Sequence, residues 1–350
     1  MRFWVVFVVL CSIVIFQLGA TTTSTATALI SRLLETVFTQ SKARMLDDKS
    51  KIVIPFILSK FEEFRQRQQH EQQPNGGISP PFFVGLNGVQ GVGKTTLVTE
   101  LQKTLTSEPY SLPIVVWSID DLYLTHDAQV QLAQTNSDNL LVQHRGEPST
   151  HDMKLANEVF EALKNGRPTM IPRYDKSKFN GQGDRAPSSE WTPVERQVDL
   201  VLFEGWCVGF KPLPDQEVEK RWQDSVKEHA LNPDSDSQST LWKHKLEHLL
   251  FINSRLREYN IMTDTFDAFV HIDAENTRYV YNWRLQQEAE LRRNTGKGMT
   301  DAQVVEFVDG YYPAYELYTE GLRKGIFSSS GAQLRLVVAR DRHVVSSLIV

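Results

Sequence analysis

Apolar and polar residues follow two different periods along this chain. Several short segments are almost wholly apolar and are bounded by polar or turn-forming residues, while the segments between them carry apolar residues at helical spacing. Short apolar runs that alternate with helical stretches are typical of a parallel sheet covered by helices on both faces. The pattern therefore predicts an α/β fold with five strands, at residues 82–86, 114–119, 200–203, 268–272 and 334–338.

The first 28 residues form an apolar leader. An almost uncharged run from Phe3 to Leu18 is followed by a stretch rich in Thr, Ser and Ala. This run is short for a membrane span and resembles the core of a signal peptide. The sequence leaves three interpretations open: a signal, a membrane anchor, or an upstream extension of a reading frame that starts at Met45.

Residues 29–79 form a second region. Apolar residues recur there at helical spacing, and a polar segment from Gln66 to Gly77, rich in Gln, follows them. We expect two helices and then a linker. The main domain is predicted at residues 80–350.

The first predicted strand leads directly into a glycine-rich segment, Gly-Val-Gln-Gly-Val-Gly-Lys-Thr-Thr at residues 88–96, and a helix-like sequence follows. Glycines free the backbone to surround an anion with its N–H groups, and a helix that begins there adds the positive end of its dipole. Lys94 can then reach the β- and γ-phosphates of a nucleoside triphosphate, and Thr95 can offer its hydroxyl to Mg²⁺. We therefore expect ATP and Mg²⁺ to be bound by this segment, through Gly88, Gly91, Gly93, Lys94, Thr95 and Thr96.

Acidic residues follow two of the other strands, at the edge where open α/β sheets bind ligands. Asp120 and Asp121 come directly after the second strand, and Glu204 comes directly after the third. A kinase that phosphorylates a hydroxyl needs a carboxylate base near that hydroxyl, and it profits from carboxylates that support Mg²⁺. We interpret Asp120 as the base and, with Thr95 and Glu204, as part of the metal site. The alternatives are that the Asp pair caps the following helix and that Glu204 is a turn residue that meets solvent.

Two polar loops between these strands, at residues 143–152 and 172–177, are dense in hydrogen-bonding groups. If they fold over the active edge, their cationic side chains form a pocket suited to an acceptor that carries a carboxylate. The residues that we assign to this acceptor site are Asp121, Tyr123, Arg145, His151, Arg173, Tyr174, Lys176 and Arg185. Taken one at a time, each is equally compatible with an ordinary surface position.

A segment after the fourth strand has the features of a lid. Residues 282–293 are helix-like and end in a basic cluster, and a turn with two glycines follows. Arg284, Arg292 and Arg293 are candidates to swing onto the triphosphate, exclude water and neutralise charge in the transition state, and we assign a catalytic role to Arg284. The alternative is a solvated helix face.

Composition narrows the range of partners. The net charge is −5 and no basic stripe is present, which argues against a nucleic-acid surface and favours a small-molecule partner. The two cysteines offer neither a disulfide framework nor a cysteine-based metal site, as expected for a reducing, cytoplasmic compartment. We expect membrane contact only through the leader, and the sequence leaves the oligomeric state open.

Several of these segments together resemble D-glycerate 3-kinases and their fungal kinase relatives. They are the phosphate-binding segment, Ser118 to Thr125, Arg145-Gly146 with Thr150-His151-Asp152, Pro172 to Ser177, Phe203 to Trp206 and Trp283 to Glu288. These kinases are similar in turn to uridine kinase, phosphoribulokinase and pantothenate kinase. The resemblance implies a P-loop NTPase fold with strand order 2-3-1-4-5 and a helical lid, and it implies that Asp120 is the base on the acceptor hydroxyl.

The expected activity is therefore transfer of the γ-phosphoryl group of Mg-ATP to the 3-hydroxyl of D-glycerate. A related kinase of a nucleoside or a pantothenate-like alcohol is an alternative, although the basic pocket argues against a neutral acceptor. An alternative from a different class is a nucleotide-dependent switch or binding module. The chain lacks the [NT]-K-x-D segment with which GTPases of that kind specify guanine.

Overall fold

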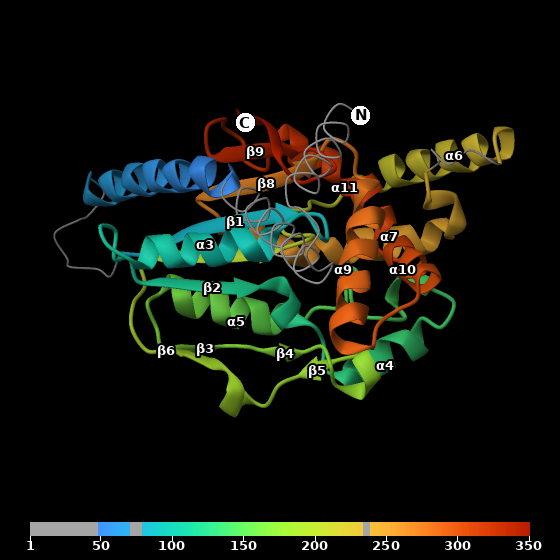
Figure 1. Ribbon diagram of the computed structural model, residues 1–350, viewed down its shortest axis with the longest axis horizontal. Coiled ribbons are helices and arrows are strands. Elements are labelled where there is room, and N and C mark those ends of the chain that lie inside the picture. The colour runs from blue at the N-terminus through green and yellow to red at the C-terminus, as the bar shows by residue number, and fades with distance from the viewer. Residues whose placement is uncertain (1–47, 71–78, 234–238) are drawn as a thin grey trace, which may run out of the picture. The chain divides into compact units, whose positions relative to one another are not determined.

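Six strands form the central sheet in the part of the chain that the structure describes (Figure 1). The structure is a computed structural model and describes residues 48–70, 79–233 and 239–350. The strands are β1 (Phe82–Gly88), β2 (Ile114–Ser118), β7 (Leu200–Gly205), β8 (Ala268–Ala274), β9 (Gln333–Val338) and β10 (Val344–Ile349). Their order is β10-β9-β8-β1-β7-β2. Five of them are parallel, and β10 lies antiparallel to β9.

The predicted fold class is confirmed, and all five predicted strands are present. Numbered along the chain, the parallel strands follow the order 2-3-1-4-5 that the resemblance implies. The expectation of five strands was wrong, because β10 adds a sixth. Its sequence, Val-Val-Ser-Ser-Leu-Ile, has two adjacent serines at its centre, and five of its six residues are exposed.

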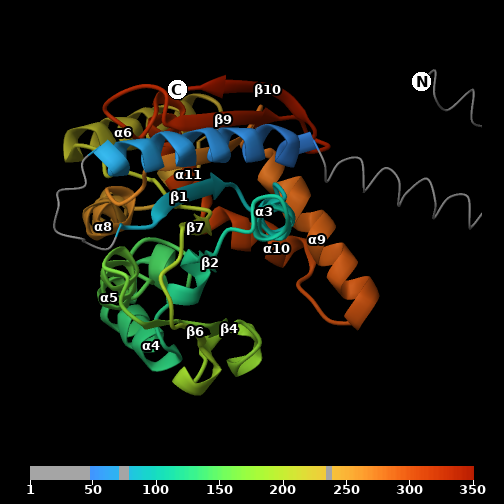
Figure 2. The ribbon, with the colours of Figure 1, turned by 90° about the vertical axis from the view of Figure 1, so that its left-hand side faces the viewer.

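Helices cover the sheet (Figures 1 and 2). The first is the N-terminal helix at residues 48–70. The others are α3 (Lys94–Thr106), α4 (His126–Thr135), α5 (Met153–Lys164), α6 (Asp215–Leu231), α7 (Leu246–Leu256), α8 (Asn260–Thr263), α9 (Tyr279–Thr295), α10 (Asp301–Asp309) and α11 (Tyr312–Lys324). Two small hairpin-like sheets pair β3 (Thr169–Ile171) with β6 (Thr192–Val194) and β4 (Tyr174–Asp175) with β5 (Asp184–Arg185).

The N-terminal helix belongs to the same compact unit as the sheet, which runs from Lys49 to Val350. The predicted linker began too early, because residues 66–70 are still helical. The leader, the earlier of the two predicted helices and the rest of the linker lie outside the described residues. Within the described ranges, no helix is long and apolar enough to cross a membrane.

Strand β1 explains why the sheet needs cover on both faces. All seven of its residues are buried, and successive side chains point to opposite faces. Phe82 packs against Phe61 and Phe64 of the N-terminal helix, which lies along one face in Figure 2. Phe83 stacks on Phe160 of α5 on the other face. A strand buried in this way has no room for alternation with polar residues, and this is why it could be recognised from its sequence.

Candidate active site

The phosphate-binding segment runs from the end of β1 to the start of α3. Gly91 and Gly93 have φ angles of 80° and 102°, in the left-handed region that favours glycine. A Cβ on Gly91 would lie 2.7 Å from the Cβ of Trp283, whereas a Cβ on Gly93 would meet nothing within 4 Å. Lys94 begins α3, and its Nζ donates to the carbonyl oxygen of Gly88 at 2.8 Å. The loop is therefore closed against α9 on one side and open at the helix N-terminus, where Thr95 and Thr96 are exposed.

The neighbouring strands bring the predicted carboxylates to this loop. Glu204 is the next-to-last residue of β7 and lies opposite Ser118 of β2 in the sheet register. Ser118 then accepts the backbone N–H of Asp120 and caps a short 3₁₀ turn. Burial lowers the pKa of Lys94, and the negative charges of Glu204 and Asp120 oppose that effect. The structure thus gathers Lys94, Asp120 and Glu204 into one charged cluster.

Lys176 completes this cluster from the acceptor side. Its Nζ lies 2.5 Å from Oδ2 of Asp120. Burial pushes the pKa of Asp120 upward, but the positive charges of Lys176 and Lys94 outweigh burial and hold that pKa below its usual value. Asp120 is therefore an anionic carboxylate at neutral pH, which is the state that a general base requires.

Asp121 has a different environment from its neighbour. Its Oδ1 accepts the backbone N–H of Tyr174 at 3.2 Å, so it ties the loop that carries Lys176 to the end of β2. Burial raises the pKa of Asp121 to about 6. The two adjacent carboxylates thus have different contacts: Asp120 faces the phosphate loop and Asp121 holds the acceptor loop.

His151 and Tyr123 form a stacked pair beside Asp120. Their ring centroids are 4.5 Å apart, and the two residues form an isolated β-bridge. Nδ1 of His151 lies 2.6 Å from the hydroxyl of Tyr259, while its buried Nε2 has no hydrogen-bond partner among the described residues. Burial lowers the pKa of His151 to about 3, so the imidazole is neutral. His151 can therefore offer a hydrogen bond to an acceptor but no charge.

The predicted arginines of the acceptor pocket divide into two groups. Arg145 donates to the carbonyl oxygen of Gly181 at 2.7 Å, and Arg185 donates to Asp152 at 2.9 Å. Both brace the β4–β5 hairpin. Arg173 instead forms an ion pair with Glu190 in which both side chains are more than half exposed. The structure brings Lys176 to the base and does not place Arg173 beside it.

The predicted lid is a helical hairpin of α9 and α10, which lie side by side in Figure 2. Arg284 pairs with Glu288 at 3.0 Å and lies 4.9 Å above the ring of Phe307. Arg292 pairs with Asp301 at 2.7 Å, across the turn between the two helices. Arg293 is exposed. In this structure Arg284 and Arg292 therefore hold the hairpin together, and their predicted contacts with phosphate require a change of partner.

Comparisons with known proteins agree with this geometry. Residues 83–219 match the family described as "Phosphoribulokinase / Uridine kinase family". A Schizosaccharomyces pombe protein described as "Uncharacterized kinase mug58" is 39% identical over 295 residues, which cover 83% of this chain and 98% of that protein. The chain belongs to the phosphoribulokinase/uridine kinase family. It is an ATP-dependent P-loop kinase.

Two further relatives of this kinase have more specific names. The chloroplastic D-glycerate 3-kinase of Arabidopsis thaliana is 40% identical over 250 residues, which cover 70% of this chain and 49% of that protein. The solved structure of a D-glycerate 3-kinase from Cryptococcus neoformans is 34% identical, with a TM-score of 0.77, and the match covers 86% of this chain and 99% of that one. The kinase thus spans about half the length of the plant enzyme and nearly the whole fungal one.

Sequence reasoning missed a cation that contacts the phosphate loop and a buried acid in the acceptor loop. Arg342, in the β9–β10 turn, donates from Nε to the carbonyl oxygen of Gly91 at 2.6 Å. Glu147 is 1% exposed, and in the part of the chain that the structure describes neither of its carboxylate oxygens has a hydrogen-bond partner. Burial raises the pKa of Glu147 well above its usual range, so this side chain is an uncharged acid. Glu147 stands inside the polar loop at residues 143–152, but nothing in its sequence context indicates burial, and no local signal links Arg342 to the phosphate loop.

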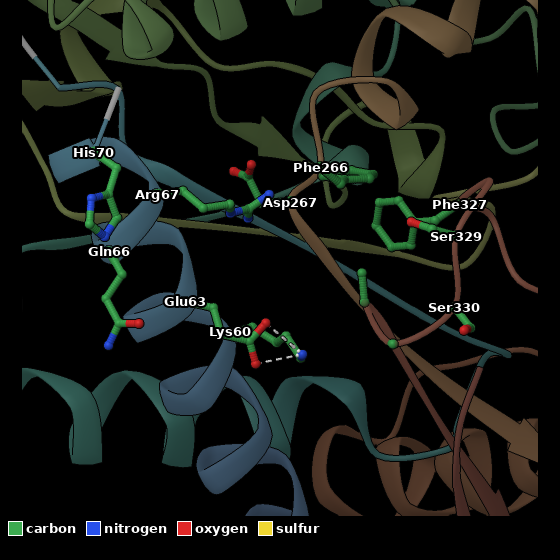
Figure 3. Close-up of a pocket in the computed structure, with 12 residues that line it drawn as sticks. Lys60, Glu63, Gln66, Arg67, His70, Phe266, Asp267, Phe327, Ser329 and Ser330 are labelled. Atoms are coloured by element: carbon green, nitrogen blue, oxygen red, sulfur yellow. Dashed lines mark hydrogen bonds and ion pairs between the residues drawn. The ribbon is translucent and has the colours of Figure 1, made fainter. Parts of the chain in front are cut away.

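A cavity of about 650 Å³ lies at the opposite, amino-terminal edge of the sheet (Figure 3). The N-terminal helix lines it with Lys60, Glu63 and Arg67, and the segment 327–332 stands across from them. Lys60 and Glu63 pair at 2.7 Å, and Asp267 carries a further carboxylate. The cavity shares no residue with the kinase site, and its charges partly neutralise one another.

Proposed function

We propose that this kinase transfers the γ-phosphoryl group of ATP to the 3-hydroxyl of D-glycerate and forms 3-phosphoglycerate. The observation that carries the proposal is the pair of Asp120 and Lys176 beside the phosphate loop. A base and a cation in contact complement an acceptor whose hydroxyl stands close to a carboxylate. The names of the plant and fungal relatives support the same acceptor.

The residues at the carboxyl edge of the sheet fit ATP with Mg²⁺. The open side of Gly93 leaves the N-terminus of α3 accessible to phosphate, and among the described residues Lys94 is bonded only to carbonyl oxygens of its own loop. Thr95, Asp120 and Glu204 offer the oxygen ligands that Mg²⁺ prefers. When bound, the ion would neutralise charge on the β- and γ-phosphates.

In the proposed reaction, Asp120 accepts the proton of the acceptor hydroxyl. The oxygen that loses this proton forms a bond to the γ-phosphorus, while the bond from that phosphorus to the β–γ bridging oxygen breaks and ADP leaves. The ammonium of Lys94 offsets the charge on the transferred group. His151 and Tyr123 wall the acceptor site with a neutral, buried surface, which excludes water beside the base.

The β4–β5 hairpin sets the position of the acceptor. Asp121 and Arg185 fix the hairpin to the end of β2 and to the start of α5, and Arg145 fixes its turn to the polar loop at residues 143–152. This bracing places Lys176 above the base, where it can bind the acceptor carboxylate through a charge-assisted hydrogen bond. Arg173 is left as a surface residue in this arrangement.

The test is a screen of the full chain for ADP release with Mg-ATP and a panel of hydroxy acids, nucleosides and pantothenate. We expect D-glycerate to give the highest kcat/KM. A nucleoside or pantothenate as the best acceptor would overturn the glycerate assignment and leave the kinase chemistry in place. ADP release that does not respond to any acceptor would overturn both and indicate a nucleotide-dependent switch.

A further inference from the structure

In this structure, the ammonium of Lys176 contacts Asp120, the proposed base. Its Nζ lies 2.5 Å from Oδ2 of Asp120, so the oxygen that would take the acceptor proton already accepts a hydrogen bond. The Lys176 side chain is 55% exposed and that of Asp120 is 32% exposed. An ion pair this open to water contributes little stability, and a competing anion can therefore displace it.

The backbone around Lys176 is held in place on both sides. Tyr174 donates its N–H to Asp121, and Ser177 donates both its N–H, at 2.9 Å, and its hydroxyl, at 2.6 Å, to Oδ1 of Asp175. Only the long side chain of Lys176 is free to change partner. It can therefore move its ammonium from one oxygen to another without a rearrangement of the loop.

The other described groups that face Asp120 do not replace Lys176. Lys94 approaches from α3, is partly buried, and is bonded to the phosphate loop. Four neutral groups also lie near Asp120, namely His151, Tyr123, Tyr311 and Cys207, and Glu204 of the same charged cluster is an anion. Asp121 carries a like charge but is bonded to Tyr174. Among these groups, Lys176 is the cation that an acceptor arriving from solvent meets first.

We propose that Lys176 masks Asp120 until the carboxylate of an acceptor draws its ammonium away. This inference rests on the proposed function and deepens it, because it makes the acceptor carboxylate the signal that frees the base. Without an acceptor, Asp120 is occupied and does not take a proton from water, so water does not attack the γ-phosphorus and ATP is not hydrolysed. Lys176 thereby selects acidic acceptors twice, by binding them and by freeing the base only for them.

The first experiment measures phosphate release from Mg-ATP without an acceptor, for the wild type and three variants. Lys176→Met removes the mask, and we expect hydrolysis to rise by about two- to fivefold, because an ion pair this open to water holds the base only weakly. Lys176→Arg keeps the charge and should hydrolyse ATP more slowly than Lys176→Met. Lys178→Met removes a nearby charge from the same loop and is the matched control, with no rise expected. Unchanged or slower hydrolysis by Lys176→Met, with ATP binding intact, would overturn the proposal.

The second experiment needs no change to the loop. D-Lactate is D-glycerate without the 3-hydroxyl, so it can draw Lys176 away but cannot be phosphorylated at that position. We expect D-lactate to stimulate ATP hydrolysis by the wild type and to have no effect on Lys176→Met, while D-glyceramide, which lacks the charge, stimulates neither. Equal stimulation by D-glyceramide and D-lactate would contradict the proposal.

Different outcomes test the glycerate kinase activity and the masking role of Lys176. If D-glycerate yields no phosphorylated product with the wild type, the proposed function is wrong, but acceptor-free hydrolysis by Lys176→Met still reports whether the base is masked. If the wild type phosphorylates D-glycerate and Lys176→Met hydrolyses ATP no faster than the wild type, the proposed function stands and the masking role is wrong.

Discussion

The nucleotide side and the acceptor side of the active site are built in different ways. The phosphate loop is shaped by its backbone, through the positive φ angles of Gly91 and Gly93 and the helix that begins at Lys94. The β4–β5 hairpin on the acceptor side has strands of only two residues each and is held mainly by side chains, among them Asp121 and Arg185.

This difference predicts how each side responds to change. A backbone cradle binds any polyphosphate of suitable shape and tolerates little substitution, because its N–H groups and glycine conformations cannot be supplied in another way. A hairpin tied by side chains can be adjusted one contact at a time. Substitutions on the nucleotide side should therefore abolish turnover, and substitutions on the acceptor side should change which acceptor is used and how tightly.

The largest effect is expected at Lys94. Lys94→Ala removes the ammonium that faces the phosphates, and we expect kcat/KM to fall by roughly 10³ or more, since the interaction strengthens in the transition state. Steady-state kinetics at saturating ATP provide the measurement. A variant that keeps more than about a tenth of wild-type activity would show that Lys94 is not central to phosphoryl transfer.

Asp120 and Asp121 are predicted to have different roles, one as the base and the other as the residue that holds the acceptor loop. Asp120→Asn should lower kcat by roughly 10²–10⁴, the usual scale for loss of a general base, with binding of Mg-ATP largely intact. Asp121→Asn should cost less, because its amide oxygen can still accept the N–H of Tyr174. Kinetics and nucleotide titration of both variants are needed. Equal losses of kcat together with weakened ATP binding in both would point to a shared role in holding metal.

Lys176 and Arg173 test the acceptor pocket as a matched pair of cations. Lys176→Ala should raise the KM for D-glycerate by about 10- to 150-fold, because a hydrogen bond to a charged group is worth ~1.5–3 kcal/mol, and it should change the KM for ATP far less. Arg173→Ala should change either KM by less than about threefold, since its exposed ion pair with Glu190 is worth little. A larger effect from Arg173→Ala than from Lys176→Ala would reverse our assignment of the carboxylate-binding cation.

The smallest effect is expected from the bracing of the hairpin. Arg185→Met breaks the ion pair with Asp152, in which both side chains are partly exposed. Such a pair is worth about 1 kcal/mol or less, so we expect a rise in the acceptor KM of up to about fivefold and no change in the KM for ATP. A rise in the KM for ATP would show that the hairpin also shapes the nucleotide side.

The contrast between a loop shaped by its backbone and a hairpin held by side chains also explains which features could be predicted from the sequence. The phosphate loop and the buried strands depend on local order, because spacing, glycine content and apolar runs determine them within a few residues. The strand-end carboxylates were predicted for a similar reason, since parallel strands bring their carboxyl ends to one edge.

The acceptor side depends on contacts between distant segments, which local patterns do not encode. Asp120 and Lys176 are 56 positions apart, and Gly91 and Arg342 are 251 positions apart. Nothing near Asp121 indicates that it ties a distant loop, and nothing in the loop at residues 172–177 separates Lys176 from Arg173. The residue types indicated an anion-binding pocket, and only the fold assigned the individual contacts.

The measurement that tests the central claim most directly is ³¹P NMR of the products formed from Mg-ATP and D-glycerate by the wild type and by Asp120→Asn. We predict that the wild type forms ADP and 3-phosphoglycerate in equal amounts and that Asp120→Asn forms both far more slowly. Release of inorganic phosphate in place of 3-phosphoglycerate, or phosphorylation at the 2-hydroxyl, would contradict the account.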